Sequence, residues 1–163
     1  PKNRMPRNYN PNPANARQSA VLLLISPYKN NELSIAFIRR AIDGRVHSGQ
    51  IGFPGGEKEL QDKDLIQTSL RETHEEIGVN PANVEVLGCL TRLFVDVSNF
   101  SVLPVVGYSD EILMFSLNDT EVSDLYIVPL EVVLDMEIIS KSKIETLHGD
   151  LEAPCFDFHD KII

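Results

Sequence analysis

The stretch that decides the fold is Arg71-Glu72-Thr73-His74-Glu75-Glu76-Ile77-Gly78-Val79. It places glutamates at positions i, i+3 and i+4, with an arginine before them and a glycine after them. At 100° per residue, Glu72, Glu75 and Glu76 fall within about one hundred degrees of one face of a helix. Like charges this close repel one another, so helix propensity does not account for them. Hard divalent cations such as Mg²⁺ or Mn²⁺ bind such oxygen-rich sites, and their chemistry is the cleavage of phosphate bonds.

The residues around this stretch predict a helix from about Asp64 to Ile77. A buried stripe is expected at spacings of four, three and four residues: Ile66, Leu70, Thr73 and Ile77. Asp62 or Asp64 can cap the N-terminus of the helix. Gly78 suits the left-handed position after the last turn, and Pro81 prevents continuation. On the helical wheel the stripe lies about one hundred degrees or more from the middle of the glutamate face, so the carboxylates are predicted to lie beside the core rather than inside it.

The rest of the chain predicts a sheet. Strands are expected at Ala20–Ser26, Leu33–Arg39, Val84–Leu93, Phe100–Val106 and Asp124–Val128, with shorter ones near Glu137–Ser140 and Cys155–Phe158. The first two form a predicted hairpin, and a short helix is expected to begin at Pro129. Residues 1–17, rich in Asn, Pro and Arg, predict an extended arm before a single domain over residues 18–163. This order predicts an α/β fold, with a mixed sheet sandwiched by helices.

The composition is that of a soluble globular protein. The 163 residues suit one domain, with 42% hydrophobic and 24% charged residues. No apolar run approaches the roughly 18 residues that span a bilayer, and no secretory signal is visible, so we expect a cytoplasmic protein without membrane contact. The formal charge of −9 argues against a nucleic-acid partner. Cys89 and Cys155 lack metal-type spacing and are expected to be buried free thiols, with a disulfide as the alternative.

A glycine-rich segment precedes the helix. Residues 41–56 contain five glycines, a composition typical of functional loops. Arg40 and Arg45 can bind phosphate, or they are surface arginines or partners of the acidic helix. Gly55 and Gly56 let backbone N–H groups face an anion, or they form a tight structural turn. The two alternatives are compatible with each other. His47 in this segment can donate to phosphate, with an incidental loop histidine as the alternative. Asp96, on a later loop, is expected near the site, with a solvated surface residue as the alternative.

The helix and the loop together resemble the Nudix box. Its usual form is Gly, five residues, Glu, seven residues, Arg-Glu, apolar, any, Glu-Glu, any, Gly, apolar. The second half matches from Arg71 to Val79. In the first half, the interval from Gly56 to Arg71 is one residue longer than usual, and Asp62 stands where the first glutamate is expected. The resemblance implies the Nudix α/β/α sandwich, with a divalent metal held by Glu72, Glu75 and Glu76.

A second motif resembles the coenzyme A diphosphatase branch of that family. It comprises Arg40-Ala41, Arg45, Gly49 and Phe53-Pro54-Gly55-Gly56, together with the lengthened box, the Thr68–Glu72 run and Val102–Gly107. Two positions depart from the branch: Ala36-Phe37-Ile38 replaces a Leu, Leu or Met, Thr run, and Asn99 stands where Gly is frequent. The resemblance also implies a C-terminal helix, which we expect to follow Ile163 in the natural protein.

The resemblance implies a Mg²⁺- or Mn²⁺-dependent diphosphatase for coenzyme A or its derivatives. Glu75 is the favoured proton acceptor for the attacking water, with Glu121, before the last long strand, as the rival. Arg71 is expected to position the carboxylates. The alternatives are a Nudix hydrolase for NADH, ADP-ribose or a nucleotide sugar, and a non-catalytic domain that senses a nucleotide. The oligomeric state stays open, with a homodimer as one alternative.

Overall fold

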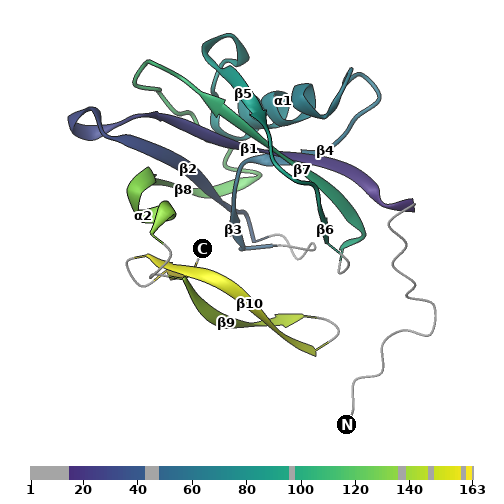
Figure 1. Ribbon diagram of the computed structural model, residues 1–163. Coiled ribbons are helices and arrows are strands. Elements are labelled where there is room, and N and C mark those ends of the chain that lie inside the picture. The colour runs from purple at the N-terminus through teal and green to yellow at the C-terminus, as the bar shows by residue number, and fades with distance from the viewer. Residues whose placement is uncertain are drawn as a thin grey trace.

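The computed structural model describes residues 15–42, 48–95, 98–135, 139–146, 149–158 and 161–162. Its main body is a mixed eight-stranded sheet with α1 and α2 packed on it (Figure 1). The elements of this body are β1 (Arg17–Pro27), β2 (Leu33–Arg40), β3 (Ile51–Gly52), β4 (Gly55–Glu57), α1 (Leu65–Ile77), β5 (Glu85–Cys89), β6 (Leu93–Val95), β7 (Phe100–Tyr108), β8 (Val122–Pro129) and α2 (Leu130–Leu134). Two 3₁₀ turns, Lys29–Asn31 and Pro81–Asn83, complete it. This confirms the predicted α/β fold.

The sheet is built around β1. Its strands follow the order β3-β2-β1-β7-β5, while β4 pairs with β1, β6 with β7 and β8 with β2. The β1–β7 pair is parallel and runs from Arg17 opposite Phe100 to Ile25 opposite Tyr108. The other pairs in this sheet are antiparallel. The N-terminal half of β1 is therefore held between β7 on one side and the short strand β4 on the other.

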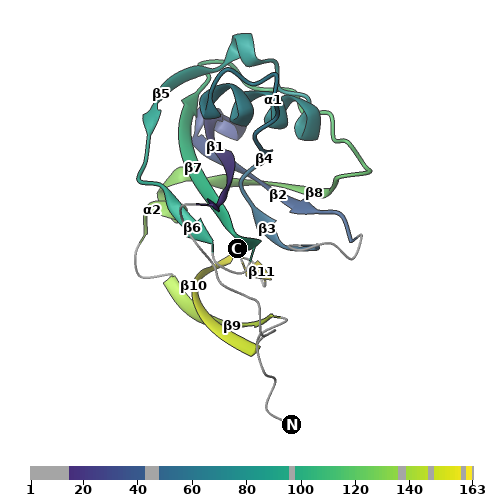
Figure 2. The same cartoon turned by 90° about the vertical axis from the view of Figure 1, so that its right-hand side faces the viewer.

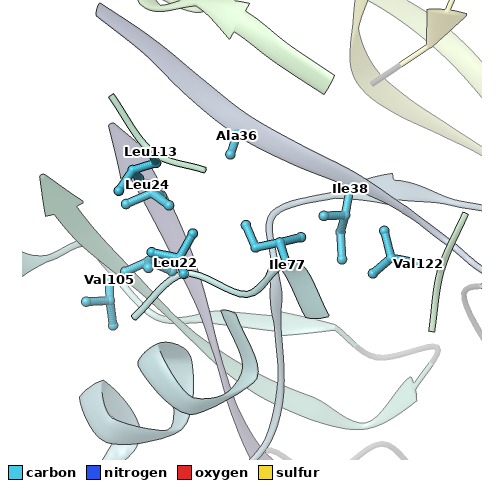
Figure 3. Close-up of a cluster of buried hydrophobic side chains, with 9 residues drawn as sticks. Leu22, Leu24, Ala36, Ile38, Ile77, Val105, Leu113 and Val122 are labelled. Carbon is cyan, nitrogen blue, oxygen red and sulfur yellow. The ribbon is translucent and has the colours of Figure 1, made fainter. Parts of the chain in front are cut away.

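Two apolar clusters show that both faces of the sheet are covered. The larger one contains buried residues of β1, β2, the end of α1, β7 and β8 (Figure 3): Leu22, Leu24, Ala36, Ile38, Ile77, Val79, Val105, Leu113 and Val122. The smaller one contains Ile35, Phe37 and Val128, with Val132 and Val133 of α2 packed against it. Alternate residues of β2 thus belong to different clusters, as the two-residue period of a strand requires. Figures 1 and 2 show α1 on the side of the sheet away from α2.

Helix α1 forms as its sequence predicts. Asp64 is the N-cap, and its Oδ1 accepts a 2.8 Å hydrogen bond from the Gln67 backbone N–H. Gly78 ends the helix in the left-handed conformation at φ 76°. Within the predicted stripe, Thr73 and Ile77 are buried, and Ile66 and Leu70 pack on the larger cluster. The alternative cap, Asp62, has a different role, described below.

Some sequence predictions fail in detail. The strand expected at Val84–Leu93 is two short strands, because β5 contains a bulge at Val86–Gly88 and the chain leaves the ladder after Cys89. Cys89 is exposed, so the prediction of a buried thiol there is wrong. It lies on the edge strand β5, where side chains alternate between half-buried and exposed. The Cys155 side chain lies outside the described part of the chain.

The last strands form a separate three-stranded sheet, with the order β11-β10-β9. Strand β9 (Ile139–Thr146) pairs antiparallel with β10 (Gly149–Phe158), and β11 (Lys161–Ile162) pairs with β10. The predicted strand Cys155–Phe158 is the end of the longer β10, and the predicted strand Glu137–Ser140 overlaps the longer β9 only at Ile139 and Ser140, because residues 137 and 138 lie outside the described part of the chain. Within the described segments, no helix is long and apolar enough to cross a membrane.

Candidate functional site

A cleft of about 750 Å³ lies between the glycine-rich segment, β1 and β7. The residues that line it include Arg17, Arg40, Gly56, Glu57, Glu72 and Phe100. This volume lies within the range of sites for small molecules, which bury most of a ligand's surface. The cleft touches the glutamate face of α1 at Glu72, so the predicted carboxylates and the predicted loop meet there.

Arg71 is the centre of the polar network on α1. Its Nε and Nη2 each donate a 3.0 Å bond to Asp62, one to each carboxylate oxygen. Its Nη2 also donates to the Glu57 carbonyl at 3.1 Å. Its Nη1 lies 2.8 Å from Glu75 Oε2 and 3.0 Å from Glu72 Oε1. One guanidinium therefore orients two of the three predicted metal ligands, as expected of a planar fork with five donors.

Asp62 is the buried counterpart of Arg71. Its side chain is 1% exposed and also accepts bonds from the Glu59 backbone N–H at 2.9 Å and the Thr68 hydroxyl at 3.0 Å. The hydrogen bonds from Arg71, above all, lower the pKa of Asp62 to about 2. Asp62 in turn raises the pKa of Arg71 above its ordinary value. The residue that departs from the usual box is therefore the anchor of Arg71.

Glu76 points into the protein rather than into solvent. It is fully buried, and its Oε2 accepts a 2.8 Å bond from the Gly55 backbone N–H. Its Oε1 has no hydrogen-bond partner among the described residues, and Arg40 Nη1 lies 3.6 Å from it, within ion-pair distance. Burial raises the pKa of Glu76 to about 8, although the Gly55 bond and the Arg40 charge oppose that rise. The nearby charge of Arg40 therefore does not fully offset the cost of burying the ionised form of this carboxyl.

Glu72 and Glu121 complete an acidic region around Glu76. Burial, first, raises the pKa of Glu72, although the charge of Arg71 opposes it. The negative charge of Glu121 raises the pKa of both Glu72 and Glu76, which places Glu121 within electrostatic reach of α1. Glu121 is exposed on the turn before β8 and accepts a 2.8 Å backbone bond from Ala41. The structure thus brings together Glu121 and the helix carboxylates, about fifty positions apart in the chain.

These residues fit a divalent cation in their donor chemistry but are not arranged as a finished metal centre. No set of three or more His, Cys, Asp or Glu side chains in the described segments is positioned to hold a metal ion. Arg71 binds Glu72 and Glu75, while Glu76 faces Gly55. The orphaned, buried Oε1 of Glu76 is nevertheless the kind of oxygen that a hard cation satisfies. The metal-ligand roles of Glu72, Glu75 and Glu76 therefore stay predictions.

The glycine-rich segment contributes differently from the expectation. Gly55 does direct its N–H at an anion, but the anion is the carboxylate of Glu76. Gly56 lies so close to Glu72 that a Cβ at this position would collide with the Glu72 carboxylate. Arg40 donates from Nη1 to the Gly55 carbonyl at 3.4 Å, so it lies beside the site as predicted. Arg45, like His47 and Asp96, lies outside the described residues, and its substrate role stays a prediction.

The cleft is also lined by Phe53 of the second motif and by residues that were not predicted to belong to the site, among them Arg17, Glu57 and Phe100. Arg17 lies at the end of the segment that was predicted to be an arm, yet it begins β1. The parallel pairing of Arg17 with Phe100 could not be predicted because the two are far apart in the sequence. His74, which lies on α1 between the carboxylates in sequence, is exposed, with its Nδ1 3.2 Å from the Val79 carbonyl.

Comparison with known proteins places the chain in a family. The model of the NUDIX domain matches residues 16–146. A protein of Pectobacterium atrosepticum named "Uncharacterized Nudix hydrolase NudL" is 43% identical over 115 residues, which cover 71% of this chain and 58% of that protein. The protein of the same name from Yersinia enterocolitica is 39% identical over 117 residues, covering 72% and 58%. The chain thus spans less than two thirds of the length of these relatives.

Solved structures show the same fold. The C. elegans Ap4A hydrolase in a binary complex superposes with a TM-score of 0.59 at 18% identity, covering 69% of this chain and 80% of that one. The NUDIX domain of Shewanella oneidensis NrtR, complexed with ADP ribose, gives a TM-score of 0.56 at 24% identity, covering 79% and 83%. With the matching domain model over most of its length and the glutamate helix beside the cleft, the chain belongs to the Nudix family.

Proposed function

We propose that this protein is a Mg²⁺- or Mn²⁺-dependent diphosphatase that hydrolyses coenzyme A or its derivatives to 3′,5′-ADP and 4′-phosphopantetheine or its acylated form. The observation that carries the proposal is Glu76, a fully buried carboxyl whose Oε1 has no hydrogen-bond partner among the described residues. It lies on the same helix as Glu75 and Glu72, and Glu72 lines the cleft. The resemblance of the Arg40–Gly56 segment to the coenzyme A branch supports the substrate.

Glu72, Glu75 and Glu76 would hold the cation, which supplies positive charge and Lewis acidity beside the diphosphate. Arg71 keeps Glu72 and Glu75 turned toward one place, since one Nη1 atom contacts both. Arg40, at the edge of the cleft, binds a phosphate oxygen of the substrate. Glu75, whose side chain is 48% exposed, accepts the proton of the attacking water, and Glu121 is the rival for that step.

The substrate is tested by comparing hydrolysis of coenzyme A with that of NADH and ADP-ribose in the presence of Mg²⁺ or Mn²⁺. Release of phosphopantetheine at a kcat/KM at least tenfold above the other two supports the proposal. Faster hydrolysis of NADH or ADP-ribose would support the alternative, a Nudix hydrolase for another nucleoside diphosphate derivative. Binding of coenzyme A without any product would support a non-catalytic, nucleotide-sensing domain.

The assignment of the glutamates is tested with Glu76→Gln. The amide keeps an oxygen that accepts the Gly55 bond but removes the charge, so we expect turnover to fall by about 10³-fold or more while the fold is retained. Glu85→Gln, an exposed change on β5, is the matched control. Near-normal turnover of Glu76→Gln would refute the assignment, and the circular dichroism spectra of both variants verify folding. Double variants of Glu75 and Glu121 then separate the two candidate bases.

A further inference from the structure

One end of the cleft contains a cluster that the proposed reaction does not use, formed by Arg17, Glu57 and Phe100. The guanidinium carbon of Arg17 lies 4.0 Å from the centroid of the Phe100 ring. Arg17 Nη1 donates a 3.2 Å bond to Glu57 Oε2. The two charged side chains remain 54% and 45% exposed. All three line the cleft, so a ligand there can reach the cation, the carboxylate and the ring.

Strand pairing fixes this cluster in place. Arg17 is the register partner of Phe100 in the parallel β1–β7 pair, and its backbone N–H donates to the Asn99 carbonyl at 2.9 Å. Glu57 is opposite Ser19 in the β1–β4 pair, two residues along the strand from Arg17. Side chains two residues apart lie on the same face of a strand. The cluster is therefore carried by three adjacent strands, which run together in Figure 1.

Arg17 and Phe100 lie at a distance from the acidic end that suits one nucleotide, while Glu57 lies between. Gly56, which packs against Glu72, is opposite Ala20, three residues along β1 from Arg17. Three residues of strand span about 10 Å. Among the residues that line the cleft with the cluster are the apolar Phe53, Val95 and Val102. A diphosphate beside Glu72 would thus have a ribose-length gap before it reached Arg17 and Phe100.

The chemistry of the cluster favours a planar ring that carries an amino group. Guanidinium and phenyl groups stack on flat heteroaromatic rings, and an amino group donates to a carboxylate. A phosphate is disfavoured, because Glu57 is itself an anion bound to Arg17 and the whole chain has a formal charge of −9. We infer that Arg17, Phe100 and Glu57 form a binding site for the amino-bearing base of the nucleotide half of the substrate, such as adenine. The inference deepens the proposed function and rests on it for the nature of the ligand.

The test compares binding of AMP and IMP, which differ in having an amino or an oxo group on the purine. Isothermal titration with EDTA present removes any need for catalysis. We expect the native protein to bind AMP about tenfold more tightly than IMP. Glu57→Leu should lower AMP affinity to that for IMP, whereas Arg17→Leu and Phe100→Leu should weaken both nucleotides about tenfold, because they remove stacking. Phe100→Tyr keeps an aromatic ring and should retain AMP binding.

Glu32→Gln, an exposed change on the turn between β1 and β2, is the control and should leave both affinities unchanged. Thermal unfolding of every variant verifies that it is folded. Equal AMP and IMP affinities in the native protein, or AMP binding unaltered in a folded Glu57→Leu variant, would overturn the base site. If AMP is preferred but no diphosphate is hydrolysed, the base site stands and the proposed function fails. If coenzyme A is hydrolysed while AMP and IMP bind equally, the proposed function stands and the base site fails.

Discussion

At the residue scale, Arg71 connects the departure from the usual sequence motif to the candidate site. Asp62 takes two of its donor atoms, and Glu72 and Glu75 share a third. The shorter Asp62 side chain reaches the guanidinium with both carboxylate oxygens, and Arg71 also donates to the Glu57 carbonyl in the segment before α1. The Asp62–Arg71 pair therefore positions the two candidate carboxylates Glu72 and Glu75.

Replacing Asp62 by Asn should lower the free energy of unfolding at pH 7 by about 3 kcal/mol, because Arg71 then lacks its buried counter-charge. The pH dependence gives a sharper readout. The folded pKa of Asp62, about 2, lies below its ordinary value of 3.8, so its stabilisation is present above about pH 4 and is lost as the pH falls through 2. Urea titrations between pH 2 and 7 should therefore show a steeper acid loss in the native protein than in Asp62→Asn.

The exposed Asp110 provides the comparison, since Asp110→Asn should reproduce the native acid profile. A native profile in Asp62→Asn as well would show that the Arg71 pair contributes no net stability.

The raised pKa of Glu76 leads to a second prediction, in which the free energy of unfolding changes with pH in the opposite direction. Its folded pKa of about 8 lies above the ordinary 4.5, so between these values the unfolded chain loses a proton that the folded chain retains. The stability of the metal-free protein should thus decline as the pH rises from about 4.5 to 8. Glu76→Gln does not titrate and should remove this decline, becoming more stable at pH 8 by a few kcal/mol, since each pKa unit corresponds to about 1.4 kcal/mol.

Chemical denaturation in EDTA at pH 5, 6.5 and 8 measures the effect. Equal slopes for the native protein and Glu76→Gln would mean that Glu76 is solvated in the folded state.

At the scale of elements, α1 and β4 act as a pair. Strand β4 is only Gly55–Glu57, yet it supports both ends of the glutamate face: the Gly55 N–H binds Glu76, and Gly56 leaves room for Glu72. Its pairing with Ser19–Val21 of β1 fixes its position. Strand β4, with glycine at two of its three positions, thus allows the Glu72 and Glu76 side chains to lie against its backbone.

Gly55→Ala should destabilise the protein by about 2 kcal/mol or more. Gly55 has φ +152°, and an added Cβ would collide with the Ala20 carbonyl and lie 2.6 Å from Val21 Cα, which are backbone atoms that cannot move aside. Gly52→Ala on β3 is the matched control, because nothing lies within 4 Å of its added Cβ. Thermal unfolding of both variants is the measurement, and equal losses would disprove the role assigned to β4.

At the scale of the whole molecule, the net charge of −9 is set against a cleft whose lining includes Arg17 and Arg40. An anionic substrate is repelled at long range and is bound only where local positive charge prevails. Among the described residues, Oε1 of the buried Glu76 lacks a hydrogen-bond partner, so a bound cation would compensate its charge in the folded protein.

Mn²⁺ should therefore stabilise the folded chain. At one hundred times its dissociation constant it should add about 2.7 kcal/mol, or roughly 5–10 °C in Tm for a protein of this size. In Glu76→Gln the shift should be much smaller at the same Mn²⁺ concentration, while Glu85→Gln should behave as the native protein does. Differential scanning calorimetry against EDTA gives the comparison. Equal shifts in all three proteins would place the cation elsewhere.

Features that depend on neighbouring residues were predictable from the sequence, whereas features that depend on strand pairing were not. Asp64, Gly78 and the stripe from Ile66 to Ile77 were predictable because capping and helical periodicity depend on neighbours within about four residues. The bounds of β5 and β6 were not, because the bulge at Val86–Gly88 is a property of pairing with β7. The exposure of Cys89 follows from the position of β5 at the edge of the sheet, which strand pairing also decides.

The sequence by itself determined α1, its end at Gly78, the presence of three carboxylates on one helix and, through its motif, the Nudix family. These are carried by short-range spacing, which any folded state of this segment preserves. Only the tertiary structure decided that Asp62 anchors Arg71, that Glu76 turns inward to Gly55, that Glu121 joins the acidic region and that Arg17 stacks on Phe100. Each of these contacts depends on which strands become neighbours. Strand pairing brings together residues that are far apart in the sequence, and local spacing does not predict which of them will meet.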